Sequence, residues 1–480
     1  MVPWMKAPNR GDQSDRTKEL EKEVDFLWKD RDATQRRLDK ALAEIERLRK
    51  ELEEALRSLK RQAAPFSKGD PKPNPKRPGR KRGAQYGERA SRPVPGRVDQ
   101  EIPVPLPKKS LCCGAPVIYE DTKPQYQEDI VRQTIVRRFD VQIGHCACCG
   151  RHVQGRHPLQ TSDALGAAQV QFGPEALSMV AHLNKEMGIS HERAARVLGL
   201  GYGLQTSRSG LCRALTRLGQ KAAPTYEQLR IAVRRSPLDW MDETGWRVAA
   251  YLQWLWVVVS PEVTVYDILP GRGFAEAASI LGEDYDGALH HDGWRPYYRF
   301  LKALHQSCLS HLIHRCHDII QVASPTARRF PQAILQLFRK ALVLRDRFRD
   351  GEISLHGLYV ATGRIGASMD RLLDKSFRSK LNRRFAKHLR HERPYLFGFL
   401  YCPDLDATNN VGERAIRPAV IARKTWGGNR TASGAKTQKI LASILRTCWQ
   451  QRKDSFSSLT KLMRSPQQMI LDIVPACLSP

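Results

Sequence analysis

The 480-residue chain lacks an apolar run long enough to cross a membrane. Its longest largely apolar stretch, 252–260, is less than half of the about 20 residues that a membrane-spanning helix needs. The start of the sequence also lacks the apolar segment of a secretory signal, because Asp12, Asp15 and Glu19 lie there. We therefore expect a cytoplasmic protein that has no membrane partner.

Acidic residues are scarce compared with basic ones. Asp and Glu total 50 against 79 Lys and Arg, which gives a formal net charge of +29 and indicates a polyanionic partner such as DNA or RNA. The 11 cysteines are an odd number, and several are clustered, which favours metal ligands in a reducing compartment over disulfides. The length predicts two to four domains.

Residues 1–62 are predicted to form a coiled coil. Within about 16–62, apolar or small residues recur at alternating spacings of three and four, and charged residues surround them. The seam consists of Val24, Leu27, Leu38, Ala41, Ile45, Leu48, Leu52, Ala55 and Leu59. We favour self-association into a homo-oligomer; the alternative is a solitary charged helix that packs on its own chain.

Residues 63–110 are predicted to be an extended basic linker. The stretch 60–100 holds twelve basic residues, three acidic residues and seven prolines, a composition that cannot bury a core. Its most basic part includes Arg80, Lys81 and Arg82, which we expect to lie along DNA and release counterions. A solvated basic tether is the alternative.

Residues 111–157 carry a cysteine pattern that resembles a zinc ribbon. Two cysteine-bearing turns flank a segment, 127–143, that reads as strands. The candidate zinc ligands are Cys112, Cys113, Cys146 and Cys149, with His145 as a replacement for Cys112. Ser110 stands where a second CxxC pair would need a cysteine, so a metal-free hairpin is the alternative.

Residues 158–235 are predicted to be helical and similar to a helix-turn-helix. The helices are expected at 174–187, 190–198 and 207–218, with Ser190 and Ser207 as N-caps. Basic residues, among them Arg208 and Arg213, would then contact DNA. A plain helical bundle explains the pattern equally well.

Residues 236–462 are predicted to form a mixed α/β domain, followed by a C-terminal tail at 463–480. Strands are expected at 238–242, 251–259, 262–269, 287–292 and 304–309, with a helix at 274–281. Residues from about 312 to 400 read as a helical, basic insertion, and 408–462 as further helices interrupted at Gly427 and Gly428.

Two acids stand at predicted strand ends in this domain. Asp242 is expected to end the first strand and Asp292 the fourth, and the ends of neighbouring strands bring side chains together. A basic protein gains from acids at a DNA surface when they hold cations, and two-metal phosphoryl transfer needs such a cluster. A cap or turn role is the usual alternative for one such Asp. Spacing alone does not single out Glu413.

Three motifs resemble those of the insertion sequence 66 family of transposases. Asp242-Glu243-Thr244 looks like the first acidic motif of that family, and Asp292-Gly293-Trp294-Arg295-Pro296-Tyr297 is similar to its second, with Trp for the usual Tyr. Asn409-Asn410-Val411-Gly412-Glu413-Arg414-Ala415-Ile416-Arg417-Pro418 resembles its third. The resemblance covers nearly the whole chain. It implies a ribonuclease-H-like catalytic fold of the DDE type, in which Asp242, Asp292 and Glu413 bind Mg²⁺ or Mn²⁺.

The resemblance also implies the reaction and the partners. The protein would bind the ends of a bacterial insertion sequence and catalyse strand cleavage by water and strand transfer by a freed 3′-hydroxyl, in the nucleoid and with small accessory proteins. Asn409 and Arg417, one helical turn before and after Glu413, would support the site. Lys424 and Arg430 would contact the DNA backbone. A non-catalytic DNA-binding protein and another nuclease of the same fold are the competing hypotheses.

One further cluster stays ambiguous in the sequence. Cys308, His311, His314, Cys316 and His317 lie within ten positions and suit a metal site, but a helix without metal explains them as well.

Overall fold

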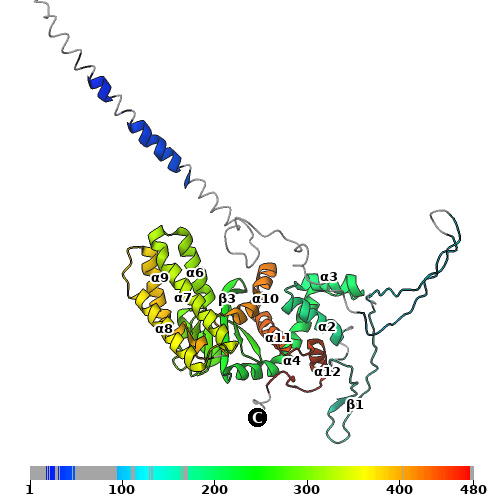
Figure 1. Cartoon of the computed structure of the whole chain (residues 1–480). Coiled ribbons are helices and arrows are strands. Elements are labelled where there is room, and N and C mark those ends of the chain that lie inside the picture. Colours follow the sequence, from blue (N-terminus) through cyan, green and yellow to red (C-terminus); the bar gives the residue numbers. More distant parts are fainter. Residues whose placement is uncertain are drawn as a thin grey trace, which may run out of the picture. The chain divides into compact units, whose positions relative to one another are not determined.

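The computed structural model describes parts of 18–48, residues 94–109, 114–163 apart from 129, 131 and 132, residue 165, and 171–475 apart from 403 (Figure 1). The contacts divide the chain into two units, 1–126 and 127–480. No helix of the described residues is both long and apolar enough to span a membrane.

In the first unit, 22–27 and 33–45 are helical, as predicted. The apolar seam faces solvent there: Val24 is 50% exposed and Leu27 is 59% exposed. Leu38 and Ile45 are exposed as well. Pairing of this helix with a second copy stays a prediction, and Arg80, Lys81 and Arg82 lie outside the described residues.

The cysteine segment differs from the prediction. The described residues between 127 and 141 form no strand, and the hairpin consists of β1 (Ile143–His145) and β2 (His152–Gln154), paired antiparallel. Cys146, Cys148 and Cys149 therefore lie in the turn at the tip of this hairpin instead of flanking a longer one. Alternating β-formers suggested strands at 127–143, but side chains such as Ile130 and Val136 are largely exposed and find no sheet to join.

A five-stranded mixed sheet forms the centre of the second unit. Its strands are β3 (Leu238–Val248), β4 (Tyr251–Val259), β5 (Thr264–Leu269), β6 (Ala288–His291) and β7 (Leu304–Ser307), in the order β5-β4-β3-β6-β7. The β3–β4 and β4–β5 pairs are antiparallel, and the β3–β6 and β6–β7 pairs are parallel. The predicted strands are therefore confirmed, although β3 runs six residues beyond Asp242.

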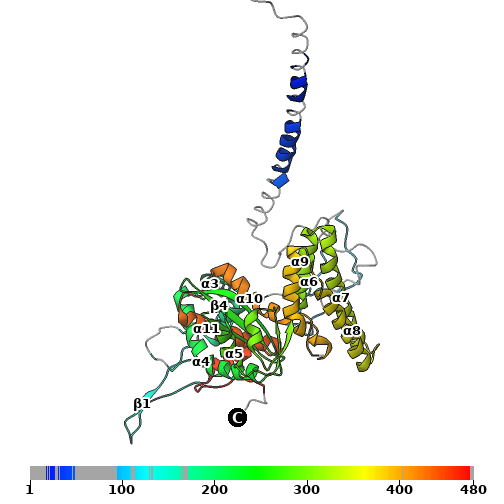
Figure 2. The ribbon, with the colours of Figure 1, turned by 90° about the vertical axis from the view of Figure 1, so that its left-hand side faces the viewer.

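One face of the sheet is covered by α10 (Asn410–Trp426), and the core beneath it continues into the helical insertion. Trp240, Trp246 and Val257 point into this core, together with Ala415 and Ala419 of α10. The insertion contains α6 (Leu309–Val322), α7 (Pro325–Arg349), α8 (Leu355–Leu373) and α9 (Lys380–Glu392), and it ends in the short turns η4 (Arg393–Tyr395) and η5 (Gly398–Leu400). Figure 2 shows α6–α9 as a bundle beside the sheet, so the segment from about 312 to 400 is largely helical.

The opposite face is covered by helices from both ends of the unit. Met241, Trp256 and Val258 point into this second core. The covering elements are α2 (Pro174–Ala181), the π-helical η2 (His182–Glu186), α3 (His191–Tyr202), α4 (Arg208–Arg234), α5 (Phe274–Leu281), η3 (Arg295–Arg299), α11 (Ala432–Gln450) and α12 (Ser455–Arg464). The helices before residue 235 thus share a core with the sheet. So does part of the expected tail, since Leu471 and Ile473 are buried there.

The helices in 171–234 begin where the sequence predicted. The Ser190 hydroxyl accepts the Arg193 N–H at 3.3 Å, and the Ser207 hydroxyl accepts the Gly210 N–H at 3.1 Å. Helix α4 continues to Arg234, past the predicted end at Leu218, because Ala222, Tyr226 and Leu229 are buried.

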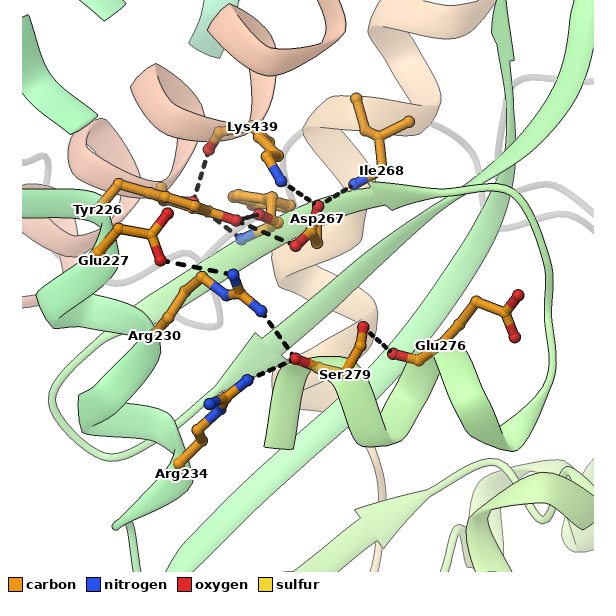
Figure 3. A network of polar contacts seen from close by, with 11 residues as sticks. Tyr226, Glu227, Arg230, Arg234, Asp267, Ile268, Glu276, Ser279 and Lys439 are labelled. Atoms are coloured by element: carbon orange, nitrogen blue, oxygen red, sulfur yellow. Dashed lines mark hydrogen bonds and ion pairs between the residues drawn. The ribbon is translucent and has the colours of Figure 1, made fainter. Parts of the chain in front are cut away.

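A polar network fastens α4 to its neighbours (Figure 3). Asp267 of β5 is 1% exposed and receives the Lys439 ammonium of α11 at 2.7 Å and the Tyr226 hydroxyl at 3.3 Å. Arg230 and Arg234 both donate to the Ser279 carbonyl of α5. The network joins helices far apart in the sequence across one face of the sheet.

Candidate active site

Asp242 lies in the middle of β3, not at its end as the sequence suggested. It is the parallel pairing with β6 that stops just before it, at Trp240 and His290. The antiparallel pairing with β4 continues, with Asp242 opposite Val257. Asp242 therefore occupies the point where the central strand leaves its parallel neighbour.

Asp292 directly follows the last residue of β6. The register pairs residue 240 with residue 290, so the same offset places Asp292 next to Asp242 beyond the ladder. Its Oδ1 accepts the Trp294 N–H at 2.9 Å, and Gly293 between them has a φ of 87°, which favours glycine. The turn after β6 thus fixes the carboxylate at the carboxyl end of the parallel strands.

Glu413 arrives on the first turn of α10, and Asn409 places that turn. The Asn409 side chain is fully buried, and its Nδ2 donates to the Met241 carbonyl at 3.0 Å. The Asn409 carbonyl accepts the Glu413 N–H at 3.0 Å. Asn409 therefore links the residue before Asp242 to the turn that carries Glu413. Asn409 is the N-cap of α10. The sequence had instead suggested that it lies within the helix, on the same face as Glu413.

The charges of Asp292 and Glu413 both reach Asp242. Burial is the largest cause that raises the pKa of Asp242 well above its usual value, and the charges of Glu243, Asp292 and Glu413 raise it further. Sequence reasoning expected Asp242 and Asp292 to meet at strand ends. Glu413 joins them from 171 positions downstream of Asp242 (413 − 242).

Glu243, Arg272 and Tyr297 lie around the two aspartates, and no pattern in the sequence indicated a role for them. Glu243 is buried on the other face of β3, where its carboxylate accepts Arg272 Nε at 2.5 Å and the Tyr297 hydroxyl. Arg272 also lies 3.9 Å from Asp292 Oδ2. Its guanidinium stacks 4.2 Å from the Trp294 ring and 4.9 Å from the Trp254 ring. This cation is thereby held beside the acidic site.

Glu392, the last residue of α9, is a further residue that the sequence did not indicate. It is 1% exposed and accepts the hydroxyls of Ser307 and Tyr298. Burial is the largest cause that raises its pKa, and the Asp292 charge contributes. Helix α9 thus ends within electrostatic reach of Asp292.

The Cys308–His317 cluster resolves into two groups. The Cys308 sulfur, a His311 ring nitrogen and a Glu413 carboxylate oxygen lie within 4.8 Å of one another, the one such group among the described residues. Cys316 is buried in the core, whereas His314 and His317 are exposed.

The predicted DNA-contacting residues of the described region are exposed. Arg208 and Arg213 lie on the first half of α4, and Lys424 and Arg430 lie at and beyond the end of α10. Arg417 is exposed on α10. Arg423, which lies between Arg417 and Lys424 in the sequence, instead contacts β3, because it donates to the Thr244 hydroxyl at 3.0 Å.

Of the predicted zinc ligands, Cys146 and Cys149 lie in the hairpin turn, and Cys112 and Cys113 lie outside the described residues. Hydrogen bonds from the Cys149 and Cys148 backbone are the largest causes that lower the pKa of Cys146. A turn that directs amide N–H groups at a sulfur favours the thiolate, which is the form that ligates metals.

The sequence matches a protein family and a known relative. A family model described as "Transposase IS66 family" matches residues 169–437, more than half of the chain, including all three carboxylates. The "Uncharacterized protein y4qI" of Sinorhizobium fredii (strain NBRC 101917 / NGR234) is 24% identical over 291 residues, which cover 54% of this chain. The match spans 53% of that relative, so the chain covers about half of its length.

Proposed function

The chain belongs to the IS66 transposase family, and on this premise we propose that it cleaves and joins DNA at the ends of an insertion sequence. One observation carries the proposal. Asp292 from the turn after β6 and Glu413 from α10 both raise the pKa of Asp242 on β3 by their charge, in a protein whose net charge is +29. The mixed sheet and its helices are compatible with a ribonuclease-H-like core.

The donor set fits Mg²⁺ or Mn²⁺. Asp242, Asp292 and Glu413 offer carboxylate oxygens, which hard divalent cations prefer. Burial is the largest cause that raises the pKa of Asp242, and repulsion from the neighbouring carboxylates raises it further. Bound cations would relieve that repulsion. When bound, two such cations would activate the attacking oxygen and stabilise the leaving one. Two metal ions would lie about 3.5–4 Å apart, so the three carboxylates can share the ions without all contacting the same one.

The surrounding residues hold the site. Asn409 is a positioning residue, because its contacts connect Met241 to the Glu413 turn. Arg272 is paired with Glu243, and its guanidinium also lies 3.9 Å from Asp292 Oδ2. We therefore assign Arg272 the role of balancing the negative charge beside the acids. Arg417, exposed on α10, would hold a DNA phosphate. Water would be the nucleophile for cleavage and the freed 3′-hydroxyl the nucleophile for joining.

We propose DNA contacts along the exposed basic residues. Arg208 and Arg213 on α4 would bind element ends in the manner of a helix-turn-helix, and Lys424 and Arg430 would contact the backbone near the site. The basic segment with Arg80, Lys81 and Arg82 would add contacts whose strength falls steeply with salt.

The N-terminal parts would assemble and brace the complex. The exposed seam at Val24, Leu27, Leu38 and Ile45 supports a coiled-coil homo-oligomer, because pairing would bury these side chains. The Cys146 turn supports a Zn²⁺ site completed by Cys149, Cys112 and Cys113. We expect the protein to act on the bacterial nucleoid in the cytoplasm, with accessory proteins of the same element.

The test is strand cleavage and joining on DNA that carries the element ends, with Mg²⁺ or Mn²⁺. Asp242→Asn, Asp292→Asn and Glu413→Gln should each abolish both reactions while DNA binding persists. Asp286→Asn is the matched control, because this acid is exposed in the loop before β6. Activity that survives Asp242→Asn would overturn the site. Binding without cleavage would favour the DNA-binding hypothesis, and cleavage without joining would favour another nuclease.

A further inference from the structure

We propose that Cys308, His311 and Glu413 form a binding site for Zn²⁺ or a similar borderline-soft cation, and that a cation bound there inhibits DNA cleavage by holding Glu413. The binding site depends only on the contacts of these residues. The inhibition rests on the proposed role of Glu413 in the active site.

The three ligand atoms already lie close together. All are within 4.8 Å of one another, and His311 Nε2 is 3.9 Å from Glu413 Oε1. Around tetrahedral Zn²⁺ with bonds of about 2.0–2.3 Å, ligand atoms lie roughly 3.3–3.8 Å apart. The side chains of His311 and Glu413 are 51% and 41% exposed, so they have room to close that difference.

Two helix starts hold the cluster together. Cys308 is the N-cap of α6 and His311 lies in its first turn, while Glu413 lies in the first turn of α10. The Leu309 N–H donates to the Ala407 carbonyl at 2.9 Å, and the Asn409 N–H donates to Cys308 Sγ at 3.2 Å. Hydrogen bonds to ligating atoms are typical of metal sites, where they orient the ligands.

The chemistry of the donors selects the cation. Thiolate, imidazole and carboxylate together suit Zn²⁺ or Co²⁺, whereas Mg²⁺ prefers oxygen ligands alone. Glu413 belongs to both donor sets, to this cluster by contact and to the carboxylate group by its charge on Asp242. A Zn²⁺ ion at this cluster would therefore withdraw Glu413 from Asp242 and Asp292.

The binding test uses Co²⁺, whose thiolate charge-transfer absorption reports a bound cysteine without any DNA. The full-length chain carries serine in place of Cys112, Cys113, Cys146, Cys148 and Cys149, so that the hairpin thiols and the other predicted zinc ligands do not contribute. We expect a saturable absorption that Zn²⁺ removes. Adding Cys308→Ser should abolish it, and adding His311→Ala should weaken Co²⁺ binding by roughly 100-fold, because only two of the three ligands remain.

His317→Ala is the matched control, because His317 is exposed on the same helix outside the cluster. It should leave Co²⁺ binding unchanged. No saturable absorption, an absorption that persists in Cys308→Ser, or equal losses in His311→Ala and His317→Ala would overturn the site. The exposed His311 keeps the test valid even where the buried Cys308→Ser change impairs folding.

The inhibition test measures DNA cleavage with Mn²⁺ and increasing Zn²⁺ in the same background. Zn²⁺ should inhibit, additional Mn²⁺ should oppose it, and His311→Ala should need much more Zn²⁺ than His317→Ala for the same inhibition, since it lacks one ligand. Cleavage that is equally sensitive to Zn²⁺ in both variants would refute the inhibitory role. A chain that never cleaves DNA would instead refute the proposed function, and the Co²⁺ titration would still decide the metal site.

Discussion

Replacing Asn409 by alanine should separate folding and DNA binding from cleavage. The side chain is fully buried, and its amide donates to the Met241 carbonyl, one residue before Asp242. Its own Oδ1 has no hydrogen-bond partner among the described residues, so alanine removes the hydrogen bond to Met241 and no bond to Oδ1. The substitution therefore loosens the connection between β3 and the start of α10.

The size of the effect follows from this hydrogen bond. A buried group that loses its partner costs about 1–3 kcal/mol, which is the expected decrease in free energy of unfolding. A shift of about 1 Å in a catalytic group lowers the rate about 100-fold. We expect Asn409→Ala to cleave DNA about 100-fold more slowly because Glu413 is no longer held beside Asp242.

The assay compares Asn409→Ala with Asn410→Ala, because the neighbouring asparagine is exposed. Cleavage rates are measured over a range of Mn²⁺ concentrations, at a temperature where circular dichroism shows both variants folded, and DNA binding is measured by gel shift. Binding should be equal in the two. If Asn409→Ala cleaves DNA within about twofold of Asn410→Ala, the positioning argument is wrong, since it requires about 100-fold.

Three further predictions concern stability and assembly. Lys439→Met leaves the buried Asp267 carboxylate without its cationic partner, so urea unfolding should show a loss of about 3–5 kcal/mol that Asp267→Asn largely restores; a loss below about 1 kcal/mol would contradict this. Burial raises the pKa of Asp239 well above its usual value, so the folded state binds more protons than the unfolded state between the ordinary pKa and the raised one. The wild type should therefore lose stability relative to Asp239→Asn as the pH rises, by at most about 1.4 kcal/mol per pH unit, in chelator-treated protein; a constant difference would argue against a protonated Asp239. Deleting 1–62 should reduce the number of protomers in the oligomer, as measured by light scattering. An unchanged number of protomers would exclude the coiled coil.

The sheet could be predicted from the sequence because its strands are apolar runs with clear ends. The run at 251–259 matches β4 residue for residue, and the helix at 274–281 matches α5. Helix α4 runs 16 residues beyond the predicted end at Leu218 (234 − 218), although it contains Gly219 and Pro224, which disfavour a helix interior. In the folded chain Gly219 lies against Thr437 of α11. The helix continues past Pro224, and the residues buried in its following turns include Tyr226 and Leu229. Tertiary packing outweighed local preference there.

The site was predictable only in part for a similar reason. Strand ends point to Asp242 and Asp292, whereas Glu413 entered through the resemblance to a family. The pairing of Glu243 with Arg272 and Tyr297 spans 29 and 54 positions, and Cys308 lies 105 positions before Glu413 (413 − 308). Such pairs depend on how the sheet and helices meet, and no local pattern records them.

The cover of the sheet has a consequence for how the protein is made. Helix α10 closes one face and α11 closes the other, and both are synthesised after the whole insertion. A ribosome that has released the chain only to the end of α9 has produced β3 and β6 without the helix that delivers Glu413. The nascent protein would thus present its basic N-terminal half to nucleic acid before it holds a complete set of carboxylates, and the capacity to cut would be acquired last.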